Sequence, residues 1–461
     1  MKVVLLFLCF WSIHSASGQR FFTDQEFYGI ILKNHPLAKQ AGLKPMMGES
    51  QILKAQGGFD PKFFSDYSEK TYNSTTNFQK LNAGVTIPTW YGIQLKSGYE
   101  AVSGPFFNPE SKTPSGGLFY GGISVTLGQG LMMDQRRAEL FKARIYEEST
   151  QFEKQMLLNE LVYESGYAYW NWFLAHHSLL VMENSYELAL TRLAAVKISS
   201  EGGDRPMIDT VEARIQVQAR QSLLVNFQNE LANSRVFVSN YLWDESLRPL
   251  SLLDESTPIE LETIAIKLVD ILSVEDLDSL VETHPYLQMN NLKVKSLQVE
   301  QKLKREQLKP QLNLNYNMIN EPINNNPFYA ISPNNNKFGL QFEMPLLLRK
   351  ERGELELAKL KVQDEQLNLT NNFVYLKSKI IQSMNNLTNA QTQVTIFEQS
   401  VLDTKTLFDA EKSMFESGES SLFLVNAREM SYIQAKLKYI EAVTKYQQAF
   451  LAFQFSLAKL I

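Results

Sequence analysis

The chain has 461 residues, with 45 lysines and arginines, 50 aspartates and glutamates, and a formal net charge of −5 at pH 7. No cluster of basic residues stands out against this acidic balance, so we expect no nucleic acid partner. The 44% hydrophobic content can bury a large core, and the length alone would suggest two or three domains. The only cysteine, Cys9, excludes disulfides and cysteine chemistry from the rest of the chain.

Residues 1–18 have the pattern of a secretory signal peptide. Lys2 provides the positive charge, Val3 to Trp11 form the apolar stretch, and Ala16-Ser17-Gly18 supplies small residues before a cleavage site. This stretch is too short for a membrane-spanning helix, which needs roughly 20 residues. No later apolar run is long enough either. A membrane-bound form would therefore need a closed β-barrel, because only helices and barrels satisfy their backbone hydrogen bonds in lipid.

The rest of the chain contains two similar halves. His35-Pro36 recurs as His284-Pro285, and Pro61 recurs as Pro310, both 249 residues later. Further along the offset is 215 residues, and the matching pairs are Arg137/Arg352, Glu139/Glu354, Leu140/Leu355, Ala143/Ala358, Asn171/Asn386, Ala195/Ala410, Lys197/Lys412 and Gly203/Gly418. The first half therefore contains an insertion of 34 residues. We predict a first repeat at residues 19–243, a linker or equatorial region at 244–273, and a second repeat at 274–461.

Each half opens with a helical pattern, at residues 23–56 and 274–308. A proline follows histidine in both stretches and disfavours helical geometry in the residue before it, so we predict a break there. A further break is predicted at Pro45.

Strand-like alternation of apolar and polar residues follows in each half. The clearest run is residues 311–318, where leucine, tyrosine and methionine alternate with glutamine and asparagine. Residues 338–344, 91–100 and 119–127 alternate in the same way. A strand with lipid on one side and water on the other shows this period of two, although a soluble sandwich would show it as well.

The predicted strands are few, and their hairpins end in long polar loops at residues 103–115 and 320–336. So few strands cannot close a barrel within one chain, so the sheet needs partner chains. The insertion adds a candidate hairpin, with strands at residues 81–87 and 91–100 and a turn at Pro88-Thr89. The sequence leaves open whether each chain contributes four or six strands.

Two very long helical patterns follow the strands, at residues 131–199 and 346–416, and neither contains proline. At ~1.5 Å per residue each would be about 100 Å long. Each ends in a glycine-containing turn, from which a second helix returns, at residues 207–243 and 422–460. The spacing of their apolar residues favours antiparallel coiled-coil packing.

This ordered set of elements, present twice, resembles the TolC-like outer-membrane efflux protein family, also called outer membrane factors. Local patterns add to the resemblance: Gly57-Gly58-Phe59-Asp60-Pro61 before the first strand, Gly128-Gln129-Gly130-Leu131 after the last strand of the first half, and residues 415–423 at the second helical turn.

The resemblance implies a mainly α fold with a membrane β-barrel portion. In such a homotrimer, each protomer supplies strands to one shared β-barrel and two helical hairpins to a long periplasmic α-barrel. The usual barrel of the family has four strands per protomer. The location implied is the outer membrane of a Gram-negative bacterium, with contact to outer-membrane lipid and extension into the periplasm.

The function implied is passive conduction as the outer-membrane channel of a tripartite efflux or type I secretion system. The implied partners are a periplasmic adaptor (membrane fusion) protein and an inner-membrane transporter. The alternative is a soluble periplasmic coiled-coil scaffold. The sequence does not identify the cargo.

The resemblance places the candidate functional residues at the two helical turns. They are Gly203, Asp204 and Asp209 at the first turn and Gly418, Glu419 and Ser420 at the second. In the family these turns form the periplasmic entrance and contact the adaptor. Asp209 fits a position where an acidic ring narrows the pore, although its repeat mate is Leu424. The alternative is that these acids are solvated turn residues.

No residue pattern indicates catalysis. His35 and His284 correspond in the repeat and precede prolines, which favours a capping role. His176 and His177 are neighbours on a predicted helix, so their side chains point in different directions and cannot share a metal ion. The sequence has no His-Glu-x-x-His motif and no cysteine pair. We therefore predict no enzyme activity, no cofactor and no metal site.

Overall fold

The computed structural model describes residues 20–264, 266, 274–321 and 334–461. The predicted signal peptide of residues 1–18, with Cys9, lies outside these ranges. Residues 265 and 267–273 of the predicted linker and residues 322–333 of the second polar loop also lie outside these ranges.

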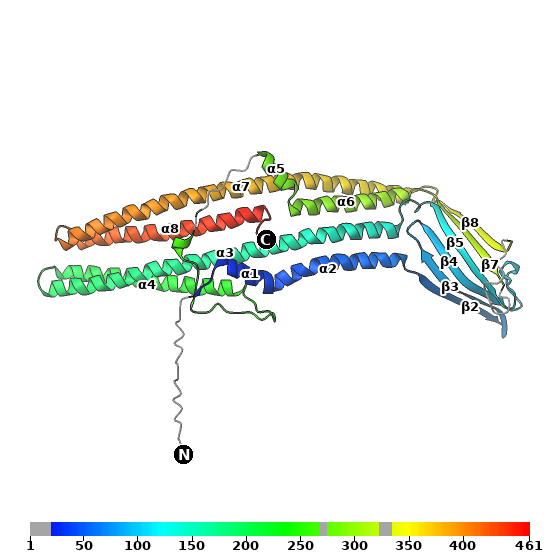
Figure 1. The fold of residues 1–461 in the computed structure, drawn as a ribbon, viewed down its shortest axis with the longest axis horizontal. Coiled ribbons are helices and arrows are strands. Elements are labelled where there is room, and N and C mark those ends of the chain that lie inside the picture. The colour runs from blue at the N-terminus through cyan, green and yellow to red at the C-terminus, as the bar shows by residue number, and fades with distance from the viewer. Residues whose placement is uncertain (1–19, 265, 267–273, 322–333) are drawn as a thin grey trace, which may run out of the picture. The chain divides into compact units, whose positions relative to one another are not determined.

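The chain divides into two compact units, and each is described by itself. Figure 1 labels the helices and strands. Unit 1 comprises Met1–Gln40, Leu157–Ser273 and Ser378–Ile461, and unit 2 comprises Ala41–Met156 and Val274–Lys377. The two longest helices, α3 (Gln135–Glu201) and α7 (Arg349–Glu416), contribute residues to both units.

Unit 2 contains a six-stranded sheet. Its strands are β2 (Lys62–Tyr72), β3 (Thr75–Pro88), β4 (Ile93–Ser103), β5 (Leu118–Gly128), β7 (Gln311–Asn320) and β8 (Asn336–Glu343). They pair in the order β2-β3-β4-β5-β7-β8, and every pair is antiparallel. The predicted hairpin about Pro88-Thr89 is confirmed as β3 and β4. The sequence left open whether each chain contributes four or six strands, and the described residues form six in this sheet.

The two faces of the sheet differ in polarity. Directly paired residues share a face, so one row across the sheet runs through Val85, Ser97, Gly121 and Met318. Along the strands, that face is mainly aliphatic and aromatic, and Glu69 is its only charged residue in the six strands. The opposite face is mainly Asn, Gln, Ser, Thr, Lys and Gly. The predicted alternation is therefore confirmed in β4, β5, β7 and β8, and β2, for which no strand was predicted, continues the same two faces.

The sheet is open at both edges, β2 and β8. On the edge strand β8, the apolar residues Phe338, Leu340 and Phe342 are all exposed. An exposed apolar edge strand favours pairing with another strand.

The helices of unit 2 pack through small residues and ion pairs. Helix α2 (Pro36–Gln56) approaches α3 so closely at Gly48 that a Cβ atom there would lie 2.9 Å from the Glu147 Cα atom. Helix α6 (Pro285–Glu306) is joined to α3 by Lys142–Glu300 at 2.8 Å and to α7 by Lys304–Glu354 at 2.6 Å. The predicted break at Pro45 is wrong, because α2 continues through that residue. The close packing on α3 compensates for the hydrogen bond that a proline removes.

Unit 1 is centred on an aromatic core. Phe27 of α1 (Asp24–Asn34) and Tyr169, Trp172 and Phe173 of α3 are fully buried. The Tyr169 hydroxyl donates a hydrogen bond to the Phe22 carbonyl at 2.8 Å. Strand β1 (Arg20–Phe21), at the start of the described chain, pairs in parallel with β6 (Ser256–Thr257). Part of the predicted linker region thus packs within unit 1.

Unit 1 also contains the two returning helices, α4 (Met207–Ser239) and α8 (Leu422–Ser456). They begin where the sequence predicted and end a few residues earlier. None of the helices within the described residues combines the length and apolar character needed to cross a membrane.

The histidine-proline steps confirm the predicted capping role. The His35 Nδ1 atom accepts a hydrogen bond from the Leu37 amide at 3.2 Å, and the His284 Nδ1 atom accepts one from the Tyr286 amide at 3.1 Å. Each histidine therefore satisfies an amide in the first turn of the following helix. Helix α5 (Val274–Glu282) precedes the second of these steps.

Candidate functional site

The first candidate turn joins α3 to α4. Gly203 has a φ of +85°, a left-handed conformation in which side chains cost energy. The Asp204 amide donates a hydrogen bond to the Ser199 carbonyl at 3.0 Å, which satisfies a carbonyl at the end of α3. Glycine at this position therefore allows the chain to turn sharply into α4.

The second turn, between α7 and α8, has the same geometry. Gly418 has a φ of +81°, and the Glu419 amide donates to the Met414 carbonyl at 2.9 Å. The Ser420 hydroxyl donates to the Glu411 carboxylate. Ser421 is the N-cap of α8, because its hydroxyl accepts a hydrogen bond from the Leu424 amide at 3.3 Å.

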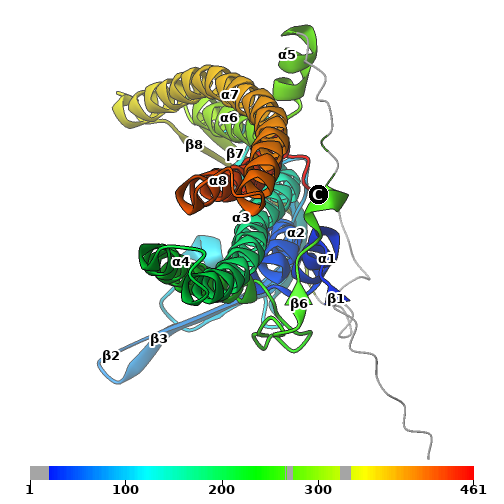
Figure 2. The same cartoon turned by 90° about the vertical axis from the view of Figure 1, so that its left-hand side faces the viewer.

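The two turns are joined by one apolar cluster in unit 1. Its members come from all four helices: Leu193, Val196, Ala213, Phe415 and Leu422. The Arg205 guanidinium lies over the Phe415 ring, 4.0 Å from its centroid. Figure 2 shows α3, α4, α7 and α8 end-on. The structure thus brings the six predicted residues onto two neighbouring turns.

The surface of the turns combines acidic and apolar residues. Asp204 and Glu419 are exposed, and Asp209 is half-buried with its carboxylate 3.8 Å from the Arg205 guanidinium. Ile198, Met207, Ile208, Val211 and Phe423 are exposed large apolar residues of the same region. Such an exposed apolar group next to charged residues is typical of a surface that contacts another chain.

A buried ionic network lies farther along the same helices. Glu429 of α8 accepts from Arg192 of α3 at 2.5 Å and also from Arg220 of α4. Arg220 is 1% exposed and Glu429 is 2% exposed. Arg220 also donates to the Ser185 carbonyl at 3.0 Å, and Arg192 to the Asn426 side chain at 2.8 Å. The network links the first helical hairpin to the second within unit 1.

Sequence reasoning missed this network, although a pattern could have indicated part of it. Val217 and Arg220 lie on one helical stripe with Ala213, and Glu429 lies on another with Val425. A charged residue at a core position needs a buried partner of opposite charge. These stripes would have indicated that both residues are buried charges, although not which residue each one pairs with.

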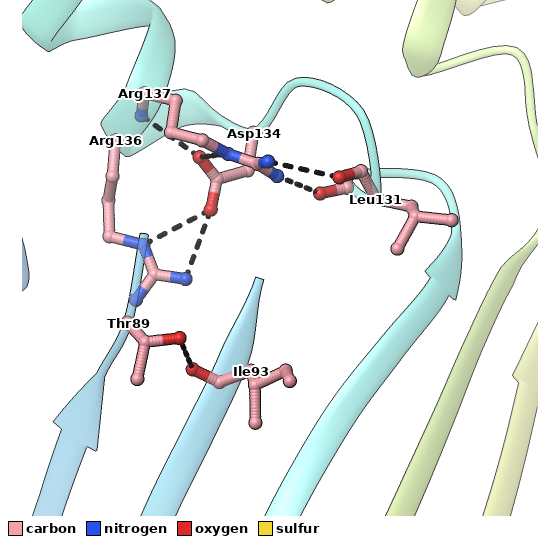
Figure 3. A network of polar contacts seen from close by, with 7 residues as sticks. Thr89, Ile93, Leu131, Asp134, Arg136 and Arg137 are labelled. Atoms are coloured by element: carbon pink, nitrogen blue, oxygen red, sulfur yellow. Dashed lines mark hydrogen bonds and ion pairs between the residues drawn. The ribbon is translucent and has the colours of Figure 1, made fainter. Parts of the chain in front are cut away.

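A second polar cluster, the Asp134 cluster, lies in unit 2 where β5 leads into α3 (Figure 3). The Asp134 carboxylate accepts from the Arg137 amide at 2.9 Å, from the Arg137 Nε atom at 3.1 Å, and from the Arg136 Nη2 atom at 3.1 Å. Arg137 also donates to the carbonyl oxygens of Leu131 and Gly130. Burial raises the pKa of Asp134, but the hydrogen bonds and charges of Arg137 and Arg136 outweigh it and lower that pKa.

Aromatic contacts join the inserted hairpin to α3 and to the segment that precedes β2. The ring of Trp90, in the turn between β3 and β4, lies 5.5 Å from Phe59 and 5.7 Å from Phe141 of α3. The turn itself is closed by the Thr89 hydroxyl, which donates to the Ile93 carbonyl at 2.7 Å (Figure 3). The insertion therefore packs on the start of α3.

The adjacent histidines of α3 make separate contacts. The His177 Nε2 atom lies 2.9 Å from the Ile259 carbonyl oxygen. Burial lowers the pKa of His176 to about 4, with smaller contributions from the charges of His177 and Arg235. In the part of the chain that the structure describes, no three His, Cys, Asp or Glu residues are grouped to hold a metal ion.

Residues 277–459 match the family model described as outer membrane efflux protein. The comparison with curated proteins gives no match. Among solved structures, the chain is similar to CusC, with a TM-score of 0.68 and 14% identity over 97% of this chain and 95% of that one.

It is also similar to the CmeC outer membrane channel of Campylobacter jejuni, with a TM-score of 0.66 and 13% identity over 95% of this chain and 85% of that one. The open state of the MtrE outer membrane channel of Neisseria gonorrhoeae matches with a TM-score of 0.70 and 12% identity over 94% and 88% of the two chains. At these identities the likeness is one of fold.

Proposed function

We propose that this chain belongs to the outer membrane efflux protein family and passively conducts solutes delivered by an inner-membrane transporter and a periplasmic adaptor protein. The observation that supports this most directly is the two-faced sheet of unit 2. Its apolar face suits lipid and its polar face suits water. In a soluble coiled-coil scaffold, such an apolar face would be exposed to water, which is unfavourable.

The open edges of the sheet support a homotrimer. Strands β2 and β8 have no strand partner on their outer sides within the described residues. If β8 of each copy pairs with β2 of the next, three six-stranded sheets form one closed sheet of eighteen strands and no edge remains. The exposed residues of β8 then become buried or face lipid.

The two turns of unit 1 suit a periplasmic entrance and an adaptor contact. Asp204 and Glu419 give the turns an exposed negative charge, and Met207 and Phe423 give them an exposed apolar surface. Asp209 provides an acidic group on the first hairpin only, because Leu424 occupies the corresponding position of the second. Charged rings of this kind tune the passage of ions.

Reconstitution into liposomes tests the channel. Vesicles that contain the mature chain should release a small trapped dye such as calcein, and empty vesicles should retain it. Chemical cross-linking in detergent should give a trimer. A mature chain that stays monomeric in buffer without detergent and releases no dye would contradict the proposal.

Single-channel recording tests the entrance with matched variants. A Cβ atom at Gly203 or Gly418 would have no atom of the chain within 4 Å, so a large side chain there meets open space rather than its own fold. Gly203→Trp and Gly418→Trp should lower the conductance, whereas Gly203→Ala and Gly418→Ala, which have the same backbone strain, should not. Equal conductance in all four variants would place the entrance elsewhere.

A further inference from the structure

One row across the polar face of the sheet is rich in lysine. Direct pairing joins Lys62 of β2 to Thr86, Thr86 to Lys96 of β4, and Lys96 to Gly122. The row continues through Asn317 to Lys337 of β8. It therefore crosses all six strands with three lysines and no acidic residue.

The whole polar face has an excess of positive charge. In the six strands its lysines are Lys62, Lys70, Lys80, Lys96 and Lys337, and its acidic residues are Asp66, Glu100 and Glu343. Five positive and three negative charges give a net charge of +2 per chain on this face. The complete chain has the opposite sign, −5. The positive charge is thus a local property of the sheet.

Two lysines of the row, Lys62 and Lys337, are exposed, and Lys96 is half-buried. Lys337 is 64% exposed, and its ammonium group lies 3.9 Å from Glu100, at the outer limit of an ion pair. Lys96 donates to the Asn315 side-chain oxygen at 3.4 Å, a neutral partner that leaves its charge in place. Weak or neutral partners do not cancel these charges.

The orientation of the row follows from the opposite face. Phe63, Leu95, Ile123 and Phe338 belong to the face with a single charged residue, which is the face that lipid can cover. The polar face must then line the water-filled interior. Three copies would place nine lysines of this row around that interior.

We propose that this lysine row makes the membrane part of the channel favour anions over cations, so that this part passes negatively charged solutes more readily than positively charged ones. The inference rests on the proposed channel function and adds a charge preference to it. Lining charges act on passing ions through their electrostatic potential, which extends about one Debye length into the lumen. The acidic turns of unit 1 should favour cations instead. The effect of the lysine row is therefore measured as the change in ion preference between the wild-type chain and variants of the row.

Reversal potentials in planar bilayers under a KCl gradient test the proposal. The triple variant Lys62→Gln, Lys96→Gln and Lys337→Gln should lower the chloride-to-potassium permeability ratio at least about twofold at ~10 mM salt, where the Debye length is ~30 Å. At ~1 M salt, where the Debye length is ~3 Å, the difference should disappear.

Two control variants separate charge from structure. The triple Lys→Arg variant keeps the charges and should keep the wild-type permeability ratio. Glu69→Gln removes the charge on the apolar face and should leave the ratio unchanged. A ratio that the glutamine variant does not change, or that the arginine variant changes equally, would overturn the inference and leave the channel function intact. A wild-type chain with no conductance would contradict the channel function itself.

Discussion

The junctions between strand and helix in the two repeats occupy corresponding sequence positions but have different surroundings. Asp134 and Arg137 of the first repeat correspond to Arg349 and Arg352 of the second. Arg137 is buried with its charge paired to Asp134, whereas Arg352 is exposed. Arginine is kept at this position in both repeats. In the second repeat, however, Arg349 replaces the aspartate, so Arg352 lacks the carboxylate that allows Arg137 to be buried.

The two junctions also differ in backbone conformation and in the exposure of one apolar residue. Gly130, whose φ is +86°, corresponds to Pro345, which cannot adopt that conformation. In the second junction Leu346 is 98% exposed, whereas its counterpart Leu131 is 40% exposed; Leu347 and its counterpart Met132 are exposed to a similar degree, 65% and 71%. The first junction follows β5, an interior strand, and the second follows β8, an edge strand. An interior strand has neighbouring strands of the same chain on both sides, whereas an edge strand needs a strand of another copy on its outer side.

The largest expected effect concerns assembly. The double variant Leu346→Asp and Leu347→Asp should abolish the trimer, because two charges would replace apolar residues that another copy is expected to cover. Size-exclusion chromatography with light scattering in detergent measures the oligomeric mass. Met132→Asp, at the position that corresponds to Leu347, is the matched control and should leave the trimer intact. Loss of the trimer in the control alone would reverse the assignment of the two junctions.

The next effect concerns the stability of the first junction. Asp134→Ala should lower the free energy of unfolding by about 2–4 kcal/mol, because it leaves the buried Arg137 and the half-buried Arg136 without their carboxylate. Arg349→Ala, at the corresponding exposed position, should change it by less than the error of the measurement. Denaturant unfolding followed by circular dichroism compares them. Equal losses would show that the two junctions are energetically alike.

The helical turns should behave alike in the two repeats, in contrast to the junctions. Gly203→Ala and Gly418→Ala should each destabilise the fold by about 1–2 kcal/mol, since both glycines have a φ near +80° and neither has a neighbouring atom to clash with. Thermal unfolding of the two variants measures this. A loss of stability in only one of the two variants would contradict the expectation that the two turns are equivalent.

The smallest effect is a change in pH dependence. His176, whose pKa is lowered to about 4 from 6.5, stays neutral in the folded chain, while the unfolded chain takes up a proton below pH 6.5. Its contribution to stability is therefore complete above pH 6.5 and is lost as the pH falls toward 4. His176→Gln introduces the residue of the second repeat, Gln391, and should flatten the fall of the unfolding midpoint over this range. An unchanged slope would assign the fall to other groups.

Local patterns in the sequence were enough to predict most elements of this fold, with strand β2 as the main exception. The period-two alternation predicted the strands, the proline-free amphipathic stretches predicted the long helices, and the repeated glycines predicted the turns at Gly203 and Gly418. These features depend on residues a few positions apart, because side-chain direction in strands and helices follows from backbone geometry alone. The same reasoning failed at Pro45, where tertiary packing outweighs a local preference.

Only the tertiary structure decided which charges are buried and which strands are neighbours. Arg220 and Glu429 are 209 positions apart in the sequence, and the row from Lys62 to Lys337 joins strands from both halves of the chain. Nothing local to either residue specifies its partner. Strand register and helix packing bring such residues together. A buried charged group is stable only when its partner of opposite charge lies next to it in the folded chain.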